Sequence, residues 1–158
     1  MTIHVKRKHI TKKTATILSS IAETAVWEDS TSIRRRTGAN GMDNPSMYKT
    51  WKWYKISRTD KKTIIELTPN NIWDKTFLFF FRKFEKDVGL LDRMTNWVGT
   101  KNATSFVAVS LGEHQQILID GELIMLNTGD SVKFNITHEH EVPKVKEDNL
   151  WAIWMVVE

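Results

Sequence analysis

The sequence predicts a mainly β protein with one or two helices, arranged as a sandwich or barrel of the jelly-roll type. Short apolar segments alternate with tight-turn sequences through the last third of the chain, and one amphipathic helical pattern lies near the N-terminus. The 158 residues are 41% hydrophobic and include seven Trp and seven Phe, enough for a single core. We therefore expect one domain over residues 1–158, with residues 46–157 forming the β-rich jelly-roll core.

The N-terminal part predicts a basic segment followed by a helix. Residues 1–13 contain five Lys and Arg and no acid, which is typical of an edge strand or a basic arm. Residues 14–27 predict a helix, because apolar side chains recur at helical spacing without Gly or Pro. These side chains are Ile17, Leu18, Ile21, Ala22 and Ala25. Their stripe predicts a core-facing surface.

Residues 30–45 predict a loop that contains Arg34, Arg35, Arg36 and the pair Asn40-Gly41. The planar guanidinium groups suit phosphate or carboxylate oxygens. A solvated connector explains the same residues. The glycine spacing matches neither a Walker motif nor a dinucleotide-binding motif.

Residues 46–57 predict a strand with one wet face, since aromatic residues alternate with lysines. The candidate ligand-binding residues here are Lys49, Trp51, Lys52 and Trp53. Such a pattern can stack on and neutralise single-stranded nucleic acid. A sheet core with solvated lysines explains the pattern equally well.

Two apolar segments follow. Thr63 to Leu67 predicts a short strand after the turn at Asp60. Thr76 to Phe84 is rich in Phe and predicts buried structure, but a short apolar run fits either a strand or a helix.

The last third predicts a series of short strands joined by tight turns. The predicted strands are Ser105–Leu111, Gln116–Ile119, Glu122–Leu126, Val132–Ile136 and Leu150–Val157. Asp120-Gly121 is a strong hairpin signal between the second and the third. The last of them is almost wholly apolar, which predicts a central, buried strand.

Composition and charge limit the class of protein. Without Cys, neither a disulfide framework nor a thiolate metal site can form. Neither a membrane-length apolar run nor a signal-peptide pattern is evident, so we expect a cytosolic protein.

The charge is unevenly distributed along the chain. Residues 1–62 hold 14 Lys and Arg against 5 Asp and Glu, whereas residues 63–158 hold 9 Lys and Arg against 14 Asp and Glu. The basic half favours an acidic partner, and a solvated lysine-rich surface is the alternative.

A motif series spans residues 94–158. It runs through Met94-Thr95-Asn96-Trp97, Phe106 to Leu111, Ile119-Asp120-Gly121-Glu122, Thr128 to Asn135, His140-Glu141-Val142 and the apolar segment Leu150 to Val157. This series resembles the double-stranded β-helix of the cupin and 2-oxoglutarate oxygenase superfamily, in particular its aspartyl/asparaginyl hydroxylase-like branch.

The resemblance implies an iron site of two His and one carboxylate, in which His140 matches the distal histidine. Met94 and Asn96 stand where the other histidine and the carboxylate are expected, and neither suits Fe(II). The closing segment also lacks the Arg that the family uses to hold 2-oxoglutarate. The resemblance therefore implies vestigial positions Met94, Asn96 and His140, no bound cofactor and no catalysis.

A different metal site would use His138, His140 and His114, as in a cupin. His138 and His140 lie two residues apart, and His114 lies in an earlier turn. A solvated polar rim explains these histidines as well.

Three functions follow as hypotheses. The first is a non-catalytic binding protein whose partner is a nucleic acid, an anionic ligand or an acidic host protein. The composition resembles that of small early proteins of T-even-type phages, which would imply a role in host takeover or anti-defence, in the host cytoplasm. The second is an Fe(II)- and 2-oxoglutarate-dependent hydroxylase or metal-binding cupin with an atypical ligand set. The third is a nucleic-acid-binding module that uses the basic half.

Overall fold

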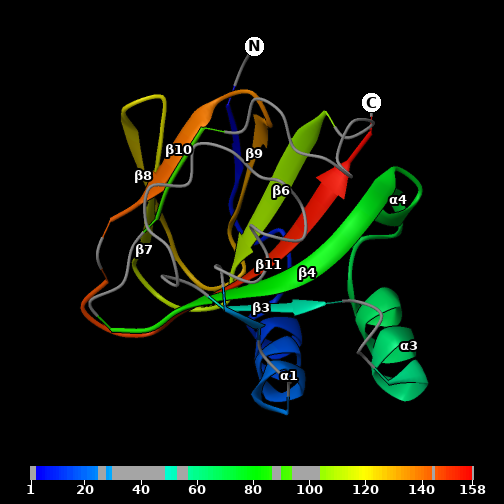
Figure 1. Cartoon of the computed structure of the whole chain (residues 1–158). Coiled ribbons are helices and arrows are strands. Elements are labelled where there is room, and N and C mark those ends of the chain that lie inside the picture. The colour runs from blue at the N-terminus through cyan, green and yellow to red at the C-terminus, as the bar shows by residue number, and fades with distance from the viewer. Residues whose placement is uncertain are drawn as a thin grey trace.

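Two antiparallel sheets form the body of the protein in a computed structural model (Figure 1). The structure describes residues 3–24, 28–29, 49–52, 57–86, 90–93, 104–143 and 145–157, without the side chains of 28–29, 49–52, 77–78 and 90–93. The seven-stranded sheet has the order β1-β9-β6-β11-β4-β3-β2, and the four-stranded sheet has the order β5-β10-β7-β8.

The strands are β1 (His4–Lys6), β2 (Glu28–Asp29), β3 (Lys49–Lys52), β4 (Thr76–Phe84), β5 (Leu90–Arg93), β6 (Ser105–Ser110), β7 (Gln115–Ile119), β8 (Glu122–Leu126), β9 (Ser131–Asn135), β10 (Glu139–Val142) and β11 (Asn149–Val156). The helices of the described ranges are α1 (Lys12–Glu23), α3 (Arg58–Leu67) and α4 (Asn70–Trp73). The predicted mainly β class is confirmed, with three helices where one or two were expected. None of these helices is long and apolar enough to cross a membrane.

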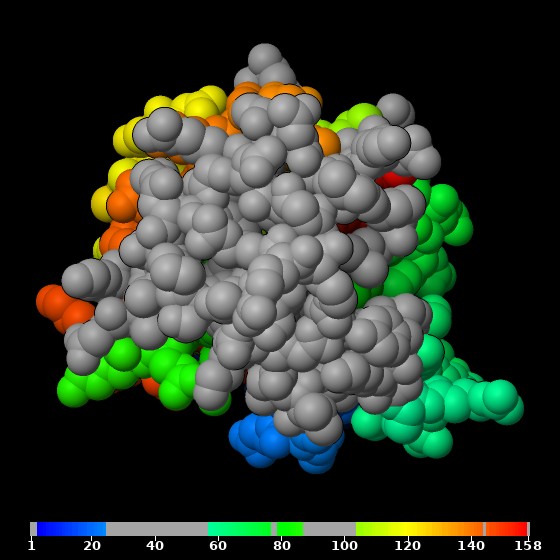
Figure 2. Space-filling model, viewed as in Figure 1, coloured from blue at the N-terminus to red at the C-terminus, as the bar shows by residue number. Residues whose placement is uncertain are grey.

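Strand β11 lies at the centre of the large sheet, paired with β4 on one side and β6 on the other. Its side chains alternate between two hydrophobic cores, because successive residues of a strand point to opposite faces. Trp151 and Ile153 face the core between the two sheets, whereas Ala152 and Trp154 face the core beneath α1 and α3. The helices α1 and α3 lie at the lower rim of the molecule (Figure 2). The predicted central, buried strand is confirmed.

Helix α1 begins two residues before the predicted start. Thr11 caps it by accepting a hydrogen bond from the backbone N–H of Thr14 at 3.1 Å. The predicted core-facing stripe is confirmed at Leu18, Ile21 and Ala22, which are buried. The helix ends at Glu23, and residues 25–27 of the prediction lie outside the described ranges.

The strand predicted at Thr63–Leu67 is wrong, because these residues belong to α3. Ser57 caps this helix by accepting a hydrogen bond from the N–H of Asp60 at 3.1 Å. Ile64 is the fully buried residue of this helix. A strand with one buried face would instead bury every second residue. Serine followed three residues later by an acid was the signal for the helix start.

The Phe-rich segment Thr76–Phe84, which fitted either a strand or a helix, is strand β4. Its pairing with two other strands selects the strand. It is held between β11 and β3, with Ile153 opposite Phe80 and Trp51 opposite Phe81. Phe79 and Phe81 face the helices, whereas Phe80 and Phe84 face the four-stranded sheet.

The five strands predicted in the last third lie within one residue of their predicted bounds, and β10 (Glu139–Val142) is a further strand without a predicted range. The Asp120-Gly121 hairpin between β7 and β8 is confirmed, with positive φ at both residues, +48° and +81°. At the N-terminus, β1 pairs with β9 at the edge of the large sheet, which is one of the two states expected for residues 1–13.

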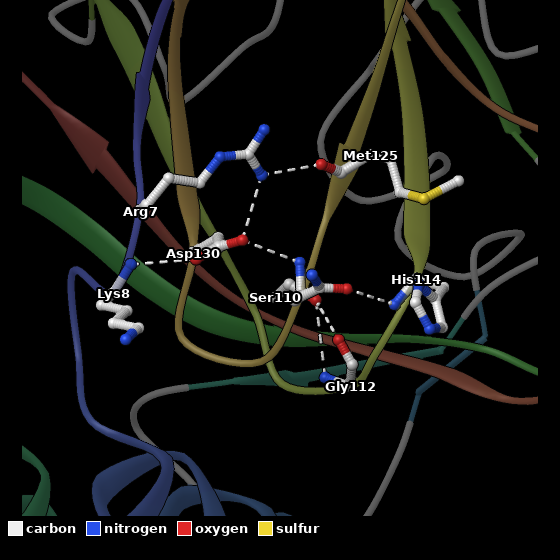
Figure 3. Close-up of polar contacts among 8 residues, drawn as sticks. Arg7, Lys8, Ser110, Gly112, His114, Met125 and Asp130 are labelled. Carbon is white, nitrogen blue, oxygen red and sulfur yellow. Dashed lines mark hydrogen bonds and ion pairs between the residues drawn. The ribbon is translucent and has the colours of Figure 1, made fainter.

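Asp130 ties the N-terminal segment to the turn between β8 and β9 (Figure 3). Its carboxylate accepts hydrogen bonds from the backbone N–H of Lys8 at 2.9 Å, the N–H of Asn127 at 2.9 Å and the guanidinium of Arg7 at 3.0 Å. Asp130 is only 5% exposed, so these bonds are largely shielded from water. Burial by itself would raise its pKa, but the hydrogen bonds from Lys8, Asn127 and Arg7 hold the pKa below the usual value.

Candidate functional site

His140 lies inside the protein, between the two sheets. It belongs to β10, where it stands opposite Asp92 of β5 and Ile119 of β7. The residue is 4% exposed, and its ring packs against Phe106 and Phe134 at centroid distances of 5.5 and 5.2 Å. Its Nδ1 lies 3.3 Å from the carbonyl oxygen of His138.

The pKa of His140 is lowered from 6.5 to about 4, chiefly by burial and also by the positive charge of Arg82. The hydrogen bond to the His138 carbonyl and the charge of Asp120 act in the opposite direction. Removal from water disfavours the charged imidazolium. His140 is therefore neutral near pH 7 and can act as a metal ligand or a hydrogen-bond partner, but not as a cation.

Arg82 is a buried cation in the same interior space, and the sequence did not single it out. It stands on β4 directly opposite Trp151 of β11, so both side chains lie on the same face of the sheet. Arg82 is 5% exposed, and its guanidinium lies 5.0 Å from the centre of the Phe80 ring. The closing strand β11 contains no Lys or Arg, whereas β4 beside it carries Arg82. Its alternation with Phe80 and Phe84 was the signal that could have revealed it.

Arg82 and His140 line one small pocket. Its other described lining residues are Phe84, Phe106, Ala108, Ile117, Phe134, Val142, Trp151 and Ile153. The space open to a water-sized molecule is about 20 Å³, which is room for about one or two waters. Apart from Arg82 and His140, the described lining residues are aromatic or aliphatic. The part of the lining that the structure describes contains no carboxylate.

The described residues do not fit an iron centre. Fe(II) in the resembled site needs two His and one carboxylate on one face of the metal. Across the described ranges no group of three His, Asp or Glu side chains is close enough to hold a metal ion. Met94 and Asn96 lie outside the described residues. Strand β5, which precedes them, ends at Arg93. Arg93 stands opposite Glu139, the residue before His140. By residue type, Met94 and Asn96 offer a thioether and an uncharged amide.

The alternative set of His138, His140 and His114 is not brought together. His138 precedes β10, and its Nε2 lies 3.8 Å from a carboxylate oxygen of Asp120. His114 precedes β7 at the end remote from Ile119, the residue opposite His140. Five strand steps of about 3.4 Å separate these two positions along β7, roughly 17 Å.

The other candidate binding residues stay predictions. Arg34, Arg35, Arg36 and Trp53 lie outside the described residues. Lys49, Trp51 and Lys52 belong to β3, which pairs with β4 and β2, but their side chains are not described.

Comparison with known proteins identifies the fold. No protein-family model and no curated protein matches the sequence. An oxidoreductase of the 2OG-Fe(II) oxygenase family from Burkholderia pseudomallei aligns over 98% of this chain and 84% of its own, with a TM-score of 0.67 at 9% identity. The chain has an oxygenase-like fold.

Two further structures agree. HygX from Streptomyces hygroscopicus, solved with nickel, 2-oxoglutarate and hygromycin B, aligns over 96% of this chain and 81% of its own, with a TM-score of 0.65 at 10% identity. A prolyl hydroxylase from Trichoplax adhaerens, in complex with a hypoxia inducible factor peptide, aligns over 98% of this chain and 83% of its own, with a TM-score of 0.65 at 9% identity. The resemblance drawn from the strand series is confirmed at the level of the fold. Activity and origin do not follow from fold alone.

Proposed function

We propose that this chain is a non-catalytic binding protein on an oxygenase-like scaffold, and that its partner is an acidic macromolecule. One observation carries the first part. Around His140, the described interior holds aromatic side chains, one imidazole and one guanidinium, with room for about one or two waters. A metal centre with its co-substrate needs three anionic or neutral ligands and open coordination positions.

Arg82 adds a second argument against a metal at His140. Its positive charge is close enough to lower the pKa of His140, so it also opposes a divalent cation at the same imidazole. The space of about 20 Å³ in the pocket is also too small for the five-carbon chain of 2-oxoglutarate beside a metal.

The charge distribution supports the acidic partner. Residues 1–62 hold 14 of the 23 Lys and Arg. In the part of this half that is described, Lys6, Lys8 and Lys13 are exposed. Clustered exposed cations attract a polyanion and speed its encounter with the protein. The composition also favours a phage protein acting in the host cytoplasm, in host takeover or anti-defence.

The catalytic question is tested by metal content and turnover. After anaerobic incubation with Fe(II) and desalting, we expect about 0.1 iron per chain or less, and no succinate from 2-oxoglutarate above a no-protein control. The reason is that, by the family resemblance, Met94 and Asn96 stand where two of the three ligands are expected. Mass spectrometry for iron and chromatography for succinate give the two readouts. Stoichiometric iron with turnover that His140→Ala abolishes would instead establish an oxygenase.

The partner is tested by the salt dependence of binding to single-stranded oligonucleotides. We expect affinity to fall with salt, and the triple change of Arg34, Arg35 and Arg36 to Ala to weaken binding at least tenfold at low salt, since each phosphate contact releases counterions. Fluorescence anisotropy measures both. The matched control replaces Lys83, Lys86 and Lys146 of the acidic half with Ala and should change affinity less than threefold. Salt-independent or undetectable binding would exclude nucleic acid and leave an acidic protein as the partner.

A further inference from the structure

A group of basic side chains lies on one face of the large sheet, at the edge where β1 runs beside β9 (Figure 1). His4 of β1 stands opposite Lys133 of β9. Lys6, two residues further along β1, stands opposite Ser131. Register partners project to the same side of a sheet. Lys133 is also the partner of Val107, which belongs to the core beneath the helices, so these basic residues lie on the helix-bearing face.

Two further basic residues reach this face from other segments. The Nδ1 of His9 lies 2.7 Å from the Oγ of Ser131, which places His9 beside Lys6. The carbonyl of Lys75 accepts a hydrogen bond at 2.8 Å from the residue that follows β11. Burial and the charge of Lys6 lower the pKa of His9. Burial and the charge of Lys75 lower the pKa of Lys133, so Lys75 also lies near this edge.

These five residues form what we call the basic face: His4, Lys6, His9, Lys75 and Lys133. His4, Lys6 and Lys75 are exposed, and the other two are partly exposed. Lys75 and Lys133 belong to the half of the sequence that has an excess of acid. The fold therefore brings cations from both halves of the chain to one surface.

The chemistry of the basic face suits phosphate more than an acidic protein. Protein–protein interfaces have a core from which Lys is depleted, whereas most contacts to nucleic acids join cations to phosphate and sugar oxygens. Val5, the apolar residue between His4 and Lys6, points to the opposite side of the sheet. His4 and Lys6 lie about 6.8 Å apart along the strand, so they present a row of basic groups to a chain of phosphates.

We propose that the basic face binds the phosphate backbone of a nucleic acid, independently of its sequence. This inference rests on the acidic partner proposed above, and it names the class of that partner and the surface that holds it. Clustered like charges repel one another, and a polyanion relieves this repulsion because it places negative charge beside each cation.

The test measures the binding of a fluorescently labelled oligothymidylate by anisotropy at 50 and 200 mM NaCl. The double change of Lys6 and Lys133 to Gln should weaken binding about tenfold or more at the lower salt. It should also reduce the salt slope by about 1.4, since two phosphate contacts of a single strand are lost. The matched control changes Lys86 and Lys146 to Gln. Both are exposed and lie near the start of β11, whereas Lys75 lies near its end, so affinity should change less than twofold.

A second measurement needs no variant. In the wild type, the oligonucleotide should shift the backbone amide NMR signals of β1 and β9 and leave those of β8, at the edge of the other sheet, unchanged. Shifts confined to other segments would overturn the basic face as the docking surface, even if the double variant does not fold. Full retention of affinity and salt slope by a folded double variant would do the same, while the acidic partner would stand.

Polyglutamate separates the class of partner from the surface. We expect it to bind at least tenfold more weakly than the oligonucleotide at 50 mM NaCl. Equal or tighter binding that depends on Lys6 and Lys133 would keep the surface but replace the nucleic acid with an acidic protein. Undetectable binding of both probes would refute the proposed acidic partner, and this inference with it.

Discussion

Asp130→Ala is expected to lower the free energy of unfolding by about 3 kcal/mol, because it leaves the N–H groups of Lys8 and Asn127 without their acceptor at a largely buried position. The Arg7 pair adds little to this figure, since the Arg7 side chain is 61% exposed. The expected fall in melting temperature is about 8 °C. Urea denaturation at pH 7 measures the free energy directly.

Asp148 supplies the matched control for Asp130. It also accepts a hydrogen bond from a backbone N–H, that of Lys86 at 2.9 Å, and lies 4.0 Å from the Nζ of Lys83. Its side chain, however, is 56% exposed, so water replaces the lost bonds. Asp148→Ala should cost about 0.5 kcal/mol. Equal losses in the two variants would contradict the role assigned to burial at Asp130.

The contribution of Asp130 also depends on pH. Its pKa in the folded protein lies below the usual 3.8, so the unfolded chain takes up the proton first as the pH falls. The stabilisation is therefore present in full above pH 3.8 and is lost as the pH falls through the lowered folded-state pKa. The difference between the wild type and Asp130→Ala should shrink in that acidic window.

The second large effect concerns His140, which should destabilise the fold as the pH drops from 6.5 to about 4. In the unfolded chain the imidazole takes up a proton near pH 6.5, whereas in the folded protein its pKa is about 4. Between these values the unfolded state binds more protons, so stability falls with falling pH. At 1.36 kcal/mol per pH unit, the loss amounts to about 3 kcal/mol.

Replacing His140 with Phe should remove most of this pH dependence, because a phenyl ring packs beside Phe106 and Phe134 and does not titrate. Urea denaturation at several pH values between 7.5 and 4.5 compares the two proteins. His9 is the control: burial and Lys6 also lower its pKa, but it is only partly buried, so His9→Gln should retain most of the pH dependence. An NMR titration of His140 with a midpoint above pH 6 would contradict the assignment.

Local sequence predicted the C-terminal sheet strands well, because each carries its own pattern. In β9 the buried Val132 and Phe134 alternate with the partly exposed Lys133 and Asn135, as the sequence does. Asp120-Gly121 supplies the positive φ values that a tight hairpin needs. The same local logic failed at Thr63–Leu67, where a short apolar run fits two structures and the cap at Ser57 was overlooked.

The candidate site was only half predictable. His140 was identified from its motif, and the structure places it in the interior. Arg82 was not predicted because the family resemblance points to a cation on the closing strand. Arg82 instead lies on β4, about 70 residues earlier in the chain, and stands opposite Trp151 of β11. Which strands become neighbours is a property of the whole chain, and no local pattern contains it.

The sequence by itself determined a mainly β chain, the order of its C-terminal strands and turns, and the absence of thiolate ligands. Turn residues and period-two alternation act over a few residues, so they can be recognised without a fold. Only the tertiary structure decided that the Phe-rich segment is a strand, that Arg82 and His140 share one pocket, and that His114 lies far from them. These outcomes depend on pairing and burial between distant segments, which arise only when the two sheets pack together.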